Sequence, residues 1–151
     1  MLFRSVVQMK KELILLFGAA MMMTGCSGEN QNGNQNNQQD DGKMQYIKTS
    51  VLYDTLMDMY TNPDNYLGKT YHMVGRLYPS ESDGEKFYSI YADGTGGKEG
   101  IGLELDWSDF SAFKDNETIT VEGKVERETG THDGKEFTYL VLRVSKIEKR
   151  E

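Results

Sequence analysis

Beyond residue 68 the sequence is a series of short segments rich in β-branched and aromatic residues, most with apolar side chains at every second position. This alternation constrains the fold most, because successive side chains of a β-strand point to opposite faces of a sheet. The segments predicted as strands are residues 69–78, 85–92, 101–107, 117–128 and 136–144. Turn-forming residues separate them and predict turns or loops at residues 79–84, 93–100 and 129–135.

Three of these strands have one clearly apolar face. The predicted inward residues are Tyr71, Met73, Gly75 and Leu77 in the first strand, Ile101, Leu103, Leu105 and Trp107 in the third, and Ile119, Val121, Gly123 and Val125 in the fourth. The last strand, residues 136–144, is apolar on both faces. These side chains can form the core of one small β domain, and a chain of 151 residues has room for little more.

An amphipathic helix is predicted ahead of the strands. Leu52, Leu56, Met59 and Tyr60 recur at helical spacing, and Pro63 then disfavours helical backbone at the residue before it. A second helical segment of one or two turns is predicted at residues 108–116. In that segment Phe110 and Phe113 lie three positions apart, and Ser108 is a suitable N-cap.

Five strands, a short helical linker between the third and fourth, and glycines within the first and fourth follow the element order of an OB fold. We therefore predict a mainly β domain at residues 44–151, a five-stranded OB-like barrel with an N-terminal amphipathic helix. An SH3-like barrel or another small five-stranded sheet stays open as the alternative, because strand count and order alone do not determine closure.

The first 25 residues have the layout of a bacterial signal peptide. Cationic residues precede an apolar run at residues 13–23, which spans roughly 16 Å as a helix and is too short to cross a bilayer. The run ends in Met23-Thr24-Gly25-Cys26, which resembles the lipobox of bacterial lipoproteins, and Cys26 is the only cysteine of the chain. This pattern predicts cleavage before Cys26 and a diacylglyceryl group on its sulfur; Met9 is an alternative start to Met1.

Residues 26–43 are predicted as the lipidated cysteine followed by a disordered, Asn/Gln-rich linker. From residue 27 to residue 43 no apolar side chain is present, so this segment cannot offset the entropy lost on ordering. Two acyl chains on Cys26, or three with an N-acyl group such as palmitate, are enough for stable anchoring. The predicted location is therefore the extracytoplasmic face of the cell membrane, with the folded domain held on a tether.

The same residues and two further motifs resemble a known family. Residues 62–70, Asn-Pro-Asp-Asn-Tyr-Leu-Gly-Lys-Thr, lead into a strand that contains Gly75, and residues 118–123 read Thr-Ile-Thr-Val-Glu-Gly. With the lipobox, this combination resembles small OB-fold lipoproteins of Gram-positive-type bacteria. Many of those proteins carry an adjacent cysteine pair in the loop before the third strand. This chain has Gly96-Gly97 there, so the resemblance implies no thiol or metal role for that loop.

Charge and composition argue against several functions. The formal net charge of −7 predicts repulsion of phosphate backbones, so no nucleic-acid partner is expected. The two histidines, His72 and His132, are too few and too far apart for zinc or for a nucleophile with its base, and no cofactor motif is present. Glu104 and Asp106 are spaced like a glycosidase pair, but acidic residues on one strand face are more typical of a solvated surface. We therefore predict no enzyme.

The remaining candidate is an aromatic surface near the first two strands, where OB folds usually bind their ligands. His72, Arg76, Tyr78 and Tyr88 form the predicted binding face, and the alternative is that the tyrosines only pack the barrel. The predicted function is a lipid-anchored binding or assembly module that contacts another envelope protein. The alternative function is a binder of a small molecule, glycan or cation at the cell envelope.

Overall fold

The computed structural model describes residues 42–151. The predictions for the signal peptide, for lipidation at Cys26 and for nearly all of the linker therefore lie outside the described residues. Three helical elements lie between the first and second strands: η1 (Thr49–Val51), α2 (Leu52–Thr61) and η2 (Pro63–Asn65). The strands are β1 (Gln45–Ile47), β2 (Thr70–Ser82), β3 (Glu85–Ala92), β4 (Ile101–Asp106), β5 (Thr118–His132) and β6 (Lys135–Lys149).

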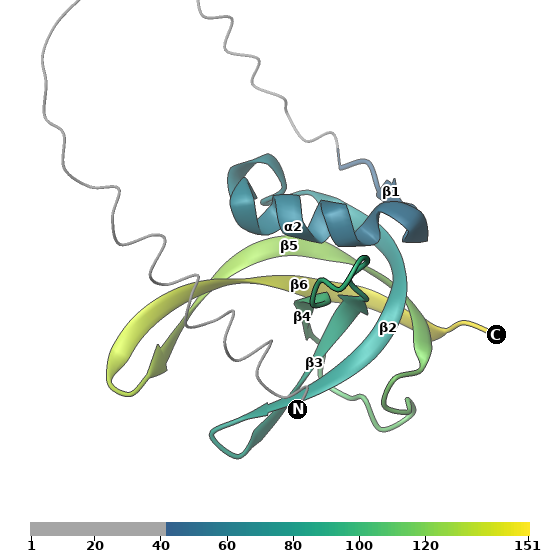
Figure 1. The fold of residues 1–151 in the computed structure, drawn as a ribbon. Helices are drawn as coiled ribbons and strands as arrows, with labels where there is room; N and C mark the ends of the chain where they lie inside the picture. Colours follow the sequence, from purple (N-terminus) through teal and green to yellow (C-terminus); the bar gives the residue numbers. More distant parts are fainter. Residues whose placement is uncertain (1–41) are drawn as a thin grey trace, which may run out of the picture.

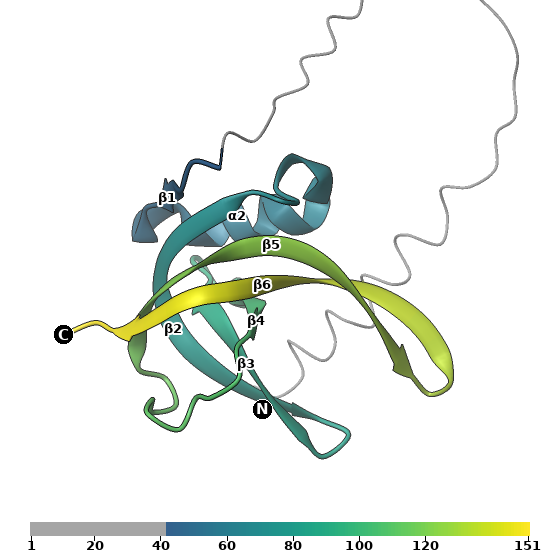
Figure 2. The same ribbon diagram turned by 180° about the vertical axis from the view of Figure 1, so that it is seen from behind.

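The strand pairings follow a ring. β2 pairs with β3, β3 with β4, β4 with β6, β6 with β5, and β5 again with β2, while β1 adds to β2 outside this ring. Only the β4–β6 and β1–β2 pairings are parallel. Figures 1 and 2 show the five long strands coiled around a common interior, with α2 lying across one end of them. This order and the parallel β4–β6 contact confirm the predicted mainly β, OB-like fold.

The interior is formed by the predicted inward faces. Met73, Leu77, Leu103, Ile119 and Val121 have no exposed surface, as the period of two requires. Leu52, Leu56 and Met59 of α2 join the same core and are at most 1% exposed. The amphipathic helix predicted from sequence thus exists, and its apolar stripe faces the sheet.

Both long hairpins are longer than predicted. The turns at residues 79–84 and 129–135 shrink to the two-residue turns Asp83-Gly84 and Asp133-Gly134, and β2 and β5 continue up to them. All four turn residues have positive φ, between 51° and 80°, which the short Asp side chain and glycine tolerate in a tight hairpin. The prediction erred because polar residues were assigned to the loops, although arms that extend beyond a core need no apolar face.

One further prediction was wrong, and one strand was missed. The linker at residues 107–117 contains turns and bends but no helix, although Phe110 and Phe113 pack against the core. The strand β1 was not predicted, since three residues with mostly exposed side chains carry no alternation. No helix within residues 42–151 has the length and apolarity needed to span a bilayer.

Candidate functional site

The four residues of the predicted binding face lie in three separate clusters. Alternation along β2 places His72, Arg76 and Tyr78 on its outward side, away from the core residue Leu77. Tyr88 has the opposite orientation, because it neighbours Ser89, the direct cross-strand partner of Tyr78. All four were predicted to lie on one face. In the structure Tyr88 pairs with Pro79 and not with Tyr78, so its side chain lies on the opposite face of the sheet from Tyr78.

His72 belongs to the first cluster. Its Nδ1 lies 2.9 Å from the Glu122 carboxylate, and its ring is 4.7 Å from the ring of Tyr46. Tyr46 is 72% exposed and comes from β1, so this cluster lies where β1 adds to the sheet.

Arg76 forms the second cluster with Tyr78 and Tyr91. The two rings are stacked 4.5 Å apart, and the guanidinium lies 4.9 Å from the centre of the Tyr91 ring. Asp93 accepts a hydrogen bond of 2.6 Å from Arg76, whose Nε is buried without a partner among the described residues. The rings of Tyr78 and Tyr91 and the guanidinium of Arg76 pack on one another, which is what the packing alternative predicted for Tyr78.

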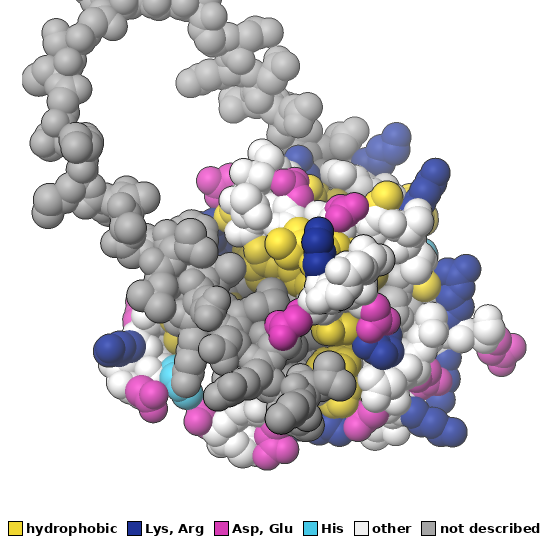
Figure 3. Space-filling view, viewed as in Figure 1, with side chains coloured by type: hydrophobic (Ala, Val, Ile, Leu, Met, Phe, Trp, Pro, Cys, Tyr) yellow, Lys and Arg dark blue, Asp and Glu magenta, His cyan; other side chains and the backbone are white. Residues whose placement is uncertain are grey.

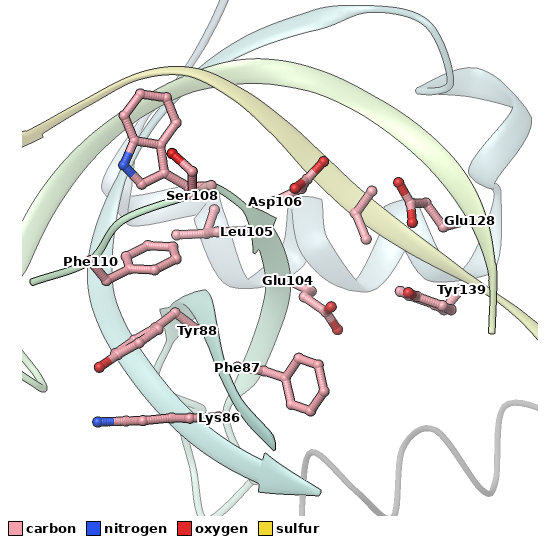
Figure 4. A pocket seen from close by; sticks show the side chains of 12 residues that line it. Lys86, Phe87, Tyr88, Glu104, Leu105, Asp106, Ser108, Phe110, Glu128 and Tyr139 are labelled. Atoms are coloured by element: carbon pink, nitrogen blue, oxygen red, sulfur yellow. The ribbon is translucent and has the colours of Figure 1, made fainter. Parts of the chain in front are cut away.

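In the third cluster, Tyr88 lines a groove. It has a volume of about 400 Å³ and lies between the two long hairpins (Figure 4). Its lining residues come from all parts of the ring except β2: Lys86, Phe87 and Tyr88 of β3; Glu104, Leu105 and Asp106 of β4; Trp107, Ser108 and Phe110 of the linker; and Glu128, Tyr139 and Val141 of β5 and β6. A groove of this size falls in the range of small-ligand and peptide sites.

Strand register explains why these side chains converge. Glu104 pairs with Val141, and Tyr139 pairs with Glu128, so these four share the outer face of the sheet. Figure 4 shows Phe87, Glu104 and Tyr139 pointing toward one another across the groove, whereas Lys86 and Tyr88 both point to the opposite side of β3. In the view of Figure 3, hydrophobic side chains at the centre of the molecule are bordered by Asp and Glu side chains.

Carboxylates dominate the charge of the groove on the side of β5 and β6. Arg143 donates hydrogen bonds to Asp106, Glu126 and Glu128, so three carboxylates share one guanidinium. The hydrogen bonds that Arg143 donates to Glu126 and Glu128 raise the pKa of Arg143 further above its ordinary value. Burial raises the pKa of Tyr139, and the charges of Glu104, Glu128 and Asp106 raise it in addition, as expected in a negative field.

The opposite wall is aromatic. The rings of Tyr88 and Phe110 lie 4.4 Å apart, and Lys86 Nζ lies 4.9 Å from the centre of the Tyr88 ring. Asp115 accepts hydrogen bonds from Lys86 and from the Tyr88 hydroxyl, at 3.3 and 3.2 Å. The hydrogen bonds with Tyr88 and Asp115 raise the pKa of Lys86. Its charge is therefore held at the edge of the groove by groups of this wall.

The tips of the two hairpins meet. His132 Nδ1, next to the second turn, lies 2.8 Å from the Asp83 carboxylate in the first turn. His132 is half-buried and links the two arms that border the groove.

Several groove residues were missed at the sequence level. Glu104 and Asp106 were recognised only as an acidic strand face, and Phe87, Glu128 and Tyr139 were not singled out. All five lie in strands that were predicted, but only the long-range pairings β4–β6 and β5–β6 bring their side chains together, and no local pattern encodes those pairings. Within residues 42–151 no group of three His, Cys, Asp or Glu side chains is arranged to hold a metal ion.

The described residues thus define a small, mainly β, OB-like domain with an open aromatic and acidic groove. The chain belongs to the family described as the DUF1980 C-terminal domain, whose model matches residues 22–151. No curated protein matches the chain in sequence.

Solved structures with a similar fold include two single-stranded DNA-binding proteins. The mitochondrial protein of S. cerevisiae is 18% identical, with a TM-score of 0.34 over 54% of this chain and 94% of that one. The small protein of Streptomyces coelicolor is 10% identical, with a TM-score of 0.36 over 55% of this chain and 94% of that one. Because both are nucleic-acid-binding proteins by name, the prediction that excluded a nucleic-acid partner from net charge alone is wrong as an exclusion.

Proposed function

We propose that this protein is a lipid-anchored, extracytoplasmic binding module without a catalytic role, and that it binds another protein of the cell envelope. The observation that supports this most is the groove of about 400 Å³ between the two hairpins. Aromatic side chains and carboxylates from four strands and a linker converge there, and such convergence at the outer face of an OB-like sheet is typical of binding.

An extended segment of a partner protein fits into a groove, whereas a broad, flat partner surface does not. The large hydrophobic side chains that are most exposed in the described part of the chain are Tyr46, Val51 and Met57. They lie on β1, η1 and α2, outside the groove, whereas the rings of Phe87, Tyr88 and Tyr139 all line it. We therefore infer that the partner inserts a short segment between the hairpins.

Affinity purification after cross-linking in native cells tests this function. The double variant Tyr88→Ala/Tyr139→Ala removes one aromatic ring from each wall of the groove. Tyr46→Ala is the matched control, because it removes an exposed ring outside the groove. We expect a stoichiometric protein partner with the unchanged chain and with the control, and its loss with the double variant. Equal recovery from all three would contradict a role for the groove.

The anchor is a separate part of the proposal, and it rests on the lipobox at residues 23–26. Cys26→Ala removes the only sulfur that can carry diacylglycerol. We expect this variant to leave the membrane fraction and to escape lipoprotein processing. A variant that stays acylated and membrane-bound would contradict the proposed location.

A second candidate is a binder of a small molecule, glycan or cation. The volume of the groove favours it, since 300 to 1,000 Å³ is typical of small-ligand sites, and rings beside carboxylates suit sugars and cations. Recovery of no protein partner, together with binding of a small ligand that the groove variant loses, would favour this candidate.

A further inference from the structure

We propose that the groove selects a positively charged, extended segment, in which lysine or arginine side chains enter between the two hairpins. This inference rests on the proposed function, because it names the chemistry of the segment that the groove binds.

Charge complementarity is the first argument. Three carboxylates line the groove, those of Glu104, Asp106 and Glu128, against the single ammonium group of Lys86. Lys86 points away from the centre of the groove and is held by Asp115. Arg143, the cation next to the lining, is shared by three carboxylates and leaves their combined charge negative. The three carboxylates that share Arg143 therefore give a cation that enters the groove a net negative field.

Aromatic rings are the second argument. Phe87, Tyr88, Trp107, Phe110 and Tyr139 line the same groove as the carboxylates. A lysine or arginine side chain gains from the face of a ring, and its aliphatic part packs on aromatic surface. Tyr139 lies close enough to Glu104 and Glu128 for their charges to affect its ionisation. One arginine of a ligand can thus contact a ring and a carboxylate together.

The linker of this chain does not supply such a segment. Residues 27–41 contain three acidic residues and no lysine or arginine, so their charge has the same sign as that of the groove. The cations Arg4, Lys10 and Lys11 lie in the predicted signal peptide, so under the proposed processing the complementary segment belongs to another chain. A second copy is the competing occupant, since its basic C-terminal segment at residues 146–150 carries three cations, and the test below includes it.

The experiment uses the full chain in detergent and two labelled peptides, octa-arginine and octa-citrulline, which have the same shape but differ in charge. Binding is measured by fluorescence anisotropy. We expect octa-citrulline to bind at least tenfold more weakly than octa-arginine. The double variant Glu104→Gln/Glu128→Gln is expected to weaken octa-arginine binding on the order of fivefold to tenfold, because two partly exposed ion pairs are lost.

A matched variant controls for net charge. Glu99→Gln/Glu151→Gln removes the same two charges at exposed positions that do not line the groove, and we expect less than a twofold change. Equal binding of the two peptides, or equal effects of the two double variants, would overturn the inference. So would tighter binding of a single-stranded DNA oligonucleotide at the groove, or self-association of the chain that the groove variant abolishes.

The proposed function and this inference fail in different ways. If a protein partner cross-links to the groove in cells but octa-arginine does not bind there, the inference about charge is wrong and the function stands. If octa-arginine binds at the groove but no envelope protein cross-links to it, cation recognition is supported and the protein partner is overturned.

Discussion

Two sides of this small domain carry hydrophobic side chains, and they differ in how far those side chains are buried. At one end of the ring of strands, α2 covers the interior with Leu52, Leu56 and Met59, and these side chains are at most 1% exposed. Between the hairpin arms, the rings of Phe87, Tyr88 and Tyr139 stay partly exposed and alternate with carboxylates. Within residues 42–151, α2 thus supplies an apolar cover for one side, and no described helix or strand covers the other.

The difference separates residues that stabilise the fold from residues available to a ligand. Apolar burial on the α2 side contributes to the free energy of unfolding, since each fully buried large side chain is worth about 1.5–3 kcal/mol. On the groove side, partial exposure and paired charges contribute little to that free energy. Substitutions in the two places should therefore affect different measurements.

The largest expected effect is at Leu56, which has no exposed surface and joins α2 to the core. Leu56→Ala should lower the free energy of unfolding by about 2–5 kcal/mol, because it removes buried apolar surface and leaves a cavity. Urea denaturation measures this loss. The control is Met57→Ala on the outer side of the same helix, 44% exposed, which should change stability by less than about 0.5 kcal/mol.

Gly75 tests the packing of α2 against the strands. A Cβ at this position would lie 2.8 Å from Ile90 Cγ1 and 2.9 Å from Leu52 Cδ2, closer than real contacts allow. Gly75→Ala should therefore destabilise the domain by about 1–3 kcal/mol through overpacking. A variant with an unchanged melting temperature would show that α2 can move away from β2 at little cost.

Tyr60 links α2 to β4 by a polar contact, since its hydroxyl donates a hydrogen bond of 2.7 Å to the Gly102 carbonyl. Tyr60→Phe should cost about 1 kcal/mol near neutral pH. Burial raises the pKa of Tyr60 above its ordinary value of 10.0, so its contribution is complete below pH 10 and is lost as pH rises above 10. Burial likewise raises the pKa of Tyr66 to about 12.

Unfolding measurements between pH 10 and 12 test whether the free energy of unfolding falls as the pH rises. The unchanged chain should lose stability with increasing pH, and each such tyrosine contributes up to about 1.4 kcal/mol per pH unit. The Tyr60→Phe slope should be shallower by that amount. A slope equal to that of the unchanged chain would mean that Tyr60 is not desolvated.

The smallest effect is expected at the hairpin tips. Asp83→Asn removes the ion pair with His132 and keeps a residue that tolerates the φ of 54°. Exposed ion pairs contribute about 0.2–1 kcal/mol, so the melting temperature should change little, and less in high salt. A loss as large as that of Gly75→Ala would mean that the groove side also holds the fold together.

The sequence predicted the parts of the fold that repeat. Alternation along β2, β4 and β5 identified the buried face correctly, because burial and strand periodicity have the same cause. The apolar stripe of α2 was also predicted correctly, because the side chains that face the core recur at the period of the helix. The hairpin arms were underestimated, since polar residues that extend beyond a core have no alternation to reveal them.

The groove was harder to predict than the core. Glu104 and Glu128 are 24 positions apart in sequence, and only the β4–β6 and β5–β6 registers bring them to the same groove. Tyr88 was chosen as a binding residue and does line the groove, while Arg76 and Tyr78 pack against Tyr91 instead. Long-range register, which local patterns do not encode, made this difference.

Site-specific photo-cross-linking in native cells tests the central claim most directly. A photoreactive phenylalanine analogue would replace Tyr88 in the groove, and in a second strain Met57 on the outer side of α2. We predict that one envelope protein cross-links in stoichiometric amount from position 88 and not from position 57. A partner captured from position 57 alone, or equally from both positions, would contradict the claim that the groove is the binding site.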